Sequence, residues 1–108
     1  MTFTVTFPLR TYSTLNQRVH WLVRAKRTKS EREATGFMVV KMPTVLPCTV
    51  RLVRLAAREL DSDNLQGCFK AARDAVAQKL GVDDADPRIT WEYAQERAKG
   101  FAVRIEVL

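Results

Sequence analysis

The chain has 108 residues, 46% of them hydrophobic and 28% charged, and a formal net charge of +6. This length supports one core, so we expect a single domain over residues 1–108. No apolar run reaches the roughly 20 residues that cross a bilayer, and residues 1–8 do not resemble a secretory signal. We therefore expect a cytoplasmic protein with no membrane partner.

The cysteines, Cys48 and Cys68, should be reduced in that compartment. Together with the single histidine, His20, they make no zinc pattern. We expect both to be small core residues.

The positive charge is concentrated in the first part of the chain. Residues 1–60 contain eleven Lys/Arg and three Glu, a net charge of +8, whereas residues 61–108 contain seven Lys/Arg and nine Asp/Glu, a net charge of −2. A basic region beside an acidic one suits a polyanion that binds next to a metal ion. The alternative is that the basic side chains only keep a small protein soluble.

The first predicted element is a strand, because Phe3, Val5 and Phe7 alternate with threonines up to Pro8. Residues 9–24 have no clean period and predict an irregular arm. Its basic, aromatic and amide side chains suit contacts to phosphates and bases. Equally, Trp21 could anchor the arm to the core while its arginines are merely solvated.

Residues 25–42 predict a helix with Phe37, Val40 and Met38 as candidates for its inner face. Lys26, Arg27 and Lys29 form a basic patch where it begins. His20 stands just before, without a second candidate ligand nearby. We expect it to hydrogen-bond to backbone or phosphate rather than to act as a base or metal ligand.

Residues 48–57 predict a second strand. Residues 64–80 give the clearest helix, with apolar residues at three- and four-residue steps, Asp63 as N-cap and Gly81 as the stop.

Residues 89–95 and 101–108 predict two further strands, which we expect to pair as a hairpin across the turn at Lys99 and Gly100. The predicted order is β-α-β-α-β-β, an α+β fold with about four strands and two helices.

All six aspartates lie between positions 61 and 86. Asp61 and Asp63 are two residues apart in a segment expected to be extended, so their side chains should point the same way. Asp63, Lys70 and Asp74 would share one stripe of the following helix. A metal site would form if Asp83 and Asp84 return to the same place.

Carboxylate oxygens suit a hard divalent cation such as Mg²⁺, which can activate water and stabilise a leaving phosphate oxygen, with a lysine neutralising the phosphate. The alternative is that these aspartates only cap a helix and form a turn. An EF-hand is excluded because its fifth and twelfth positions would be Leu65 and Ala72. A phosphate-binding P-loop and a Ser-His-Asp triad have no persuasive match.

The chain resembles the RusA family of Holliday-junction resolvases over about residues 45–108, and more loosely before them. The resemblance is carried by Asp61-Ser62-Asp63-Asn64-Leu65, by the helical segment Lys70–Ala75, and by the pair Asp83-Asp84. The chain departs from the family pattern in Gly67-Cys68-Phe69, which look like three added residues before the lysine. Three residues are nearly one helical turn, so Lys70 should stay on the same side.

The resemblance implies that Asp61, Asp63, Asp84 and Lys70 are catalytic and that Asp61, Asp63, Asp84 and less certainly Asp83 bind Mg²⁺ or Mn²⁺. It also implies a mixed sheet backed by helices and a homodimer that cuts paired strands of a four-way DNA junction. Basic side chains would contact DNA phosphates; the candidates are Arg18, His20, Arg24, Lys26, Arg27 and Lys29. Two other possibilities are a non-catalytic nucleic-acid-binding protein with this fold and a small interaction module whose aspartates only cap and turn.

Overall fold

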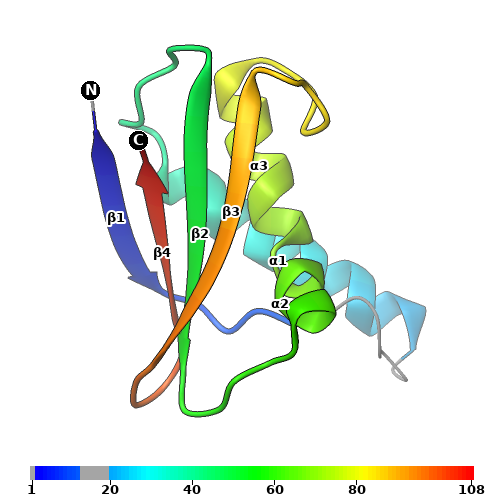
Figure 1. Cartoon of the computed structure of the whole chain (residues 1–108). Helices are drawn as coiled ribbons and strands as arrows, with labels where there is room; N and C mark the ends of the chain where they lie inside the picture. The colour runs from blue at the N-terminus through cyan, green and yellow to red at the C-terminus, as the bar shows by residue number, and fades with distance from the viewer. Residues whose placement is uncertain (1, 13–19) are drawn as a thin grey trace.

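A computed structural model describes residues 2–12 and 20–108. It is an α+β fold of four strands and three helices within these residues (Figure 1). In chain order the elements are β1 (Phe3–Pro8), α1 (Trp21–Met38), β2 (Cys48–Ala56), α2 (Ser62–Cys68), α3 (Lys70–Leu80), β3 (Ile89–Arg97) and β4 (Ala102–Val107). None of the described helices is long and apolar enough to span a membrane.

The strands form one mixed sheet in the order β1-β4-β2-β3. β2 and β3 are parallel, whereas β4 is antiparallel to both β1 and β2 (Figure 1). The predicted hairpin of the last two strands is therefore wrong. Period-two alternation identifies a strand but not its neighbour, and the more apolar β4 takes an inner position while β3, which carries Glu92 and Glu96, takes an edge.

The helices cover one face of the sheet (Figure 1). The core joins alternate residues of all four strands, such as Phe7, Leu52 and Ile105, to helix residues such as Phe69 and Val76. The opposite face carries ion pairs instead: Arg51 pairs with Glu92 and Glu106, and Arg104 pairs with Glu96 and Glu106. One apolar and one charged face are typical of a sheet that is covered on one side.

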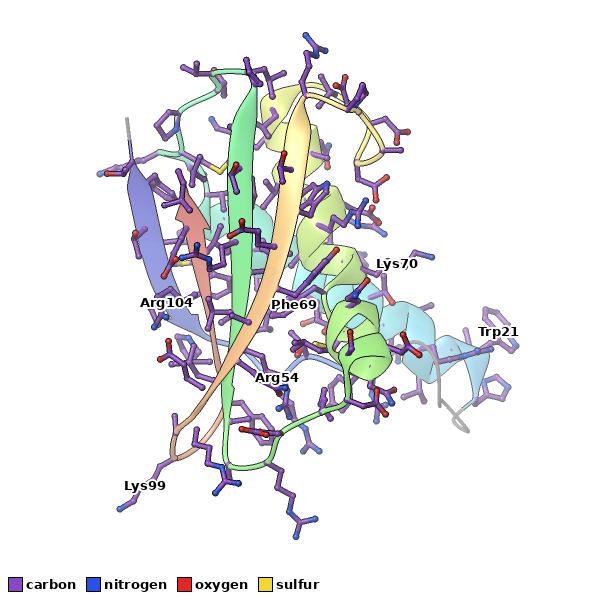
Figure 2. All side chains as sticks on the ribbon, viewed as in Figure 1. Trp21, Arg54, Phe69, Lys70, Lys99 and Arg104 are labelled. Atoms are coloured by element: carbon purple, nitrogen blue, oxygen red, sulfur yellow. The ribbon has the colours of Figure 1, made fainter. Side chains whose placement is uncertain are left out.

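α1 begins earlier than predicted, because the His20 Nδ1 accepts a hydrogen bond from the Leu22 N–H at 3.2 Å and caps the helix. Trp21 is 61% exposed and so does not anchor the arm to the core (Figure 2).

The predicted inner face of this helix is wrong at Phe37 and Val40, which are 78% and 60% exposed, although Met38 does pack against the core. Thr35 and Val39 are fully buried instead. The buried stripe of α1 starts at Glu31 and continues at Thr35, whose hydroxyl donates to the Glu31 carbonyl at 2.8 Å. The apolar residues of α1 thus do not mark its inner face.

The predicted helix over residues 64–80 is divided into α2 and α3 at Phe69. The Phe69 N–H donates to the Gln66 carbonyl, and its ring is fully buried 6.1 Å from the Tyr93 ring. The predicted stop at Gly81 is confirmed by its left-handed conformation, with a φ of 76°. Of the cysteines expected in the core, Cys68 is buried and Cys48 half-buried.

Candidate functional site

Asp61, and not Asp63, is the N-cap of α2. Its Oδ1 accepts a hydrogen bond from the Asn64 backbone N–H at 2.8 Å, and the Asn64 side-chain amide lies 3.1 and 3.2 Å from the two carboxylate oxygens. Asp63 lies in the first helical turn. The expectation that both side chains project together from an extended segment is therefore wrong, because the helix begins between them.

A surface hollow of about 570 Å³ lies beside the junction of α2 and α3. We call it the acidic hollow, and its lining consists of Asp63, Gln66, Gly67, Lys70, Arg73, Asp84 and Tyr93. Asp63, Lys70 and Asp84 are three of the four predicted catalytic residues, and they come from two separate segments of the chain. Asp61 is not among the lining residues.

Although the helix is interrupted, Asp63 and Lys70 still face the same hollow. Phe69 turns inward at the junction, and Lys70 begins α3 with its side chain exposed (Figure 2). Gly67, Cys68 and Phe69 thus lie at this junction, and Lys70 lines the same hollow as Asp63 and Asp84.

Asp84 is held in place by Arg73. The Arg73 Nε lies 3.0 Å from the Asp84 Oδ2, and this contact is an ion pair without the alignment of a hydrogen bond. The Arg73 Nη2 and the Trp91 Nε1 both donate to the Asp84 carbonyl, at 3.1 and 2.9 Å. The Arg73 Nη1 also donates to the Tyr93 hydroxyl at 2.7 Å. Arg73 therefore holds the loop that carries Asp84 against α3 and β3.

Sequence reasoning gave Arg73 no role. The sequence contains two features that could have indicated a role. Arg73 follows Lys70 by three residues on a helix, so the two share a face, and Trp91 and Tyr93 lie on the same face of a strand. The guanidinium lies 4.9 Å from the centre of the Trp91 ring, a cation–π distance.

The remaining aspartates, Asp74, Asp83 and Asp86, have surroundings that differ from those of Asp84. The Asp83 Oδ1 accepts a hydrogen bond from the Ala85 N–H at 2.8 Å, which forms a local turn. Asp74 and Asp83 line a neighbouring hollow of about 480 Å³, which Asp84 also borders. Hydrogen bonds from Arg88 lower the pKa of Asp86 to about 2, so this carboxyl is committed to its own ion pair.

Within the described part of the chain, no three His, Cys, Asp or Glu side chains are close enough together to hold a metal ion as they stand. The acidic hollow nevertheless offers oxygen donors from Asp63, Asp84, Gln66 and Tyr93. Mg²⁺ commonly takes one or two carboxylates and completes its shell with water and phosphate oxygens. These oxygen donors are of the type that such a cation binds, and Asp63 and Asp84 are the two carboxylates that could hold it.

The predicted DNA-contacting residues mostly belong to the first turns of α1. Arg24, Lys26 and Lys29 are exposed, and Lys29 lies 4.0 Å from Glu33. Arg27 is half-buried, with its guanidinium 3.9 Å from the centre of the Tyr12 ring. Arg18 lies outside the described residues.

The sequence matches no model of a protein family, and no curated protein matches it. The likeness to the RusA family therefore rests on the motif residues themselves.

Proposed function

We propose that the protein is a metal-dependent endonuclease that resolves Holliday junctions or related branched DNA by hydrolysing phosphodiester bonds. The observation that supports this most directly is the acidic hollow. Asp63, Lys70 and Asp84 line it together, although Asp84 comes from a segment of the sequence separate from the other two. Two carboxylates that could hold a metal ion and a lysine that could stabilise phosphate charge are groups that metal-assisted phosphodiester hydrolysis can use.

In this proposal Asp63 and Asp84 hold Mg²⁺ or Mn²⁺, which when bound supplies an activated water and stabilises charge on the phosphate. The exposed ammonium of Lys70 places positive charge beside a phosphate oxygen. Arg73, Trp91 and Tyr93 keep the Asp84 loop in position. Asp61 contributes indirectly, since it fixes the start of α2 and thereby the direction of Asp63.

DNA would approach over the exposed basic residues at the start of α1, including Arg24, Lys26 and Lys29. Two cuts in a symmetric junction require two hollows, which a homodimer in the cytoplasm would provide through a two-fold axis.

A four-way DNA junction incubated with Mg²⁺ tests this proposal. We expect cleavage by the natural chain, none with a chelator present, and a loss of at least about a hundredfold in Asp63→Asn. Asp86→Asn is the matched control, because it removes a carboxylate from the same loop as Asp84 but outside the acidic hollow. The control should cleave normally.

The second candidate is a nucleic-acid-binding protein without catalysis. It is favoured by two observations: Arg73 already forms an ion pair with Asp84, and Asn64 already donates hydrogen bonds to Asp61. Tight junction binding that is indifferent to chelators, with no cleavage by any of the three proteins, would establish this candidate and refute the nuclease.

A further inference from the structure

A further hollow, of about 390 Å³, lies where the end of β2 meets the segment that follows β1. We call it the arginine pocket, and its lining includes Arg10, Tyr12, Arg54, Arg58, Leu60 and Phe101. None of these residues borders the acidic hollow.

Arg54 is the most unusual side chain of the arginine pocket, because it is only 9% exposed. Its Nη1 donates to the Arg58 backbone carbonyl. Among the described residues no carboxylate forms an ion pair with it, and residues 13–19 contain no Asp or Glu. A buried charge without an opposite charge is unfavourable, so we expect Arg54 to attract an anion.

Arg10 is oriented by aromatic rings instead of by an acid. Its guanidinium carbon lies 5.1 Å from the centre of the Tyr12 ring and 4.7 Å from that of Phe101. Arg58 is exposed at the rim, and in the described part of the chain neither arginine has an ion-pair partner. Contact with the aromatic rings limits the orientations of the guanidinium, and its N–H groups, which point outward in its own plane, stay available to a ligand.

Glu31 contacts Tyr12, one of the lining residues, and this carboxyl is already occupied. Its Oε1 accepts a hydrogen bond from the Tyr12 N–H at 3.1 Å, and it is only 6% exposed. Burial raises its pKa to about 7, so near neutral pH it carries only part of a negative charge. It therefore does not neutralise the three arginines.

The wall of the arginine pocket is firmly held and continues into α2. The Leu60 N–H donates to the Gln95 side chain at 2.9 Å, and the Gln95 amide donates back to the Leu60 carbonyl at 2.8 Å. Leu60 directly precedes Asp61, the cap of α2. Figure 2 shows Arg54 below Phe69 in the view, beneath the helix junction at which Lys70 is labelled.

We propose that the arginine pocket binds a phosphate group, presented either by the backbone of a nucleic-acid strand or as a free phosphate, between the guanidinium groups of Arg10, Arg54 and Arg58. The planar fork of arginine matches phosphate oxygens in pairs. This site goes beyond the proposed nuclease, because it needs neither a metal ion nor hydrolysis.

Two probes, both used with a chelator present, test the site. The first is a labelled oligothymidylate without terminal phosphates, followed by fluorescence anisotropy. The second is inorganic phosphate, followed through the side-chain Nε–Hε resonances of the arginines. We expect Arg10→Gln and Arg58→Gln to bind the oligonucleotide roughly tenfold more weakly, the ratio that one charge-assisted contact gives. Lys41→Gln is the matched control, since Lys41 is exposed and lines a different hollow, beside β1.

Arg54→Lys keeps the buried charge but removes the fork, so it should lose affinity while remaining folded by circular dichroism. Loss of oligonucleotide affinity in these variants assigns the pocket to a nucleic-acid strand. A shift of the Arg54 resonance by inorganic phosphate, with unchanged oligonucleotide affinity, assigns it to free phosphate. The proposal is overturned if inorganic phosphate moves no arginine resonance and the pocket variants bind the oligonucleotide as tightly as the Lys41→Gln control does.

Discussion

The acidic hollow is lined in part by α2, and the arginine pocket reaches Leu60, two residues before this helix begins, but the two sites balance their charges in opposite ways. In the acidic hollow, Arg73 lies 3.0 Å from the Asp84 carboxylate and joins it to two aromatic side chains. In the arginine pocket, Arg54 is buried, and its guanidinium donates to the Arg58 backbone carbonyl but forms no ion pair with a described residue. The first site supplies its own counter-ion, whereas the second requires one from outside.

This difference has a consequence for binding. A cation that enters the acidic hollow must compete with Arg73 for Asp84, so metal affinity there is reduced by an interaction that also stabilises the fold. An anion that enters the arginine pocket competes with no described acid. We therefore expect phosphate to bind the arginine pocket at a lower concentration than a metal ion binds the acidic hollow. We also expect metal affinity to change more when a lining residue is substituted.

The largest effect should come from Arg73→Met. It removes an ion pair and hydrogen bonds to Asp84 and Tyr93, so the free energy of unfolding should fall by about 3 kcal/mol without metal. Because Asp84 is then unpaired, Mn²⁺ should raise the unfolding midpoint in urea more than it does for the natural chain. A variant that is destabilised but gains no response to Mn²⁺ would show that Arg73 does not compete with the cation.

An intermediate effect should come from Glu31, which lies behind the arginine pocket. Its pKa is raised to about 7 by burial, so its neutral form stabilises the fold below its ordinary pKa of 4.5, and this stability is lost as the pH rises through about 7. Between pH 5 and pH 8 the natural chain should lose on the order of 2 kcal/mol relative to Glu31→Gln. Urea unfolding at several pH values measures this, and parallel curves for the two proteins would contradict it.

The smallest effect should separate Asp61 from Asp63. Asp61→Ala removes the α2 cap and should cost about 1 kcal/mol, whereas Asp61→Asn should cost less, because asparagine also caps. Asp63→Asn should leave stability nearly unchanged, since Asp63 caps nothing. Thermal unfolding of the three variants provides the measurement, and equal losses at both positions would mean that the two aspartates share one role.

The sequence predicted the elements better than their arrangement. The alternation of Phe3, Val5 and Phe7 and the stop at Gly81 are local features, and they appear where expected. Strand order depends on contacts between distant segments, which a period-two pattern does not specify. The inner face of α1 was mispredicted because its buried residues, Glu31 and Thr35, are polar while Phe37 is exposed.

Part of the candidate site could be predicted as well, because that part depends on local features of the sequence. Helical spacing places Asp63 and Lys70 together, and this spacing survives the break at Phe69. The return of Asp84 depends on Arg73, Trp91 and Tyr93, which join the loop to α3 and β3 through contacts that no local motif encodes. The capping role of Asp61 was missed because helix boundaries are uncertain by one or two residues from sequence alone.

The position of β4 has a consequence for how the sheet assembles. β4 is the last strand in the chain, yet it lies between β1 and β2 and is the only described strand that pairs with β1. While the ribosome is still making residues 102–107, β1 has no neighbour to bond with, and β2 can pair only with β3. The sheet can therefore close only once β4 is available, because β4 joins β1 to β2.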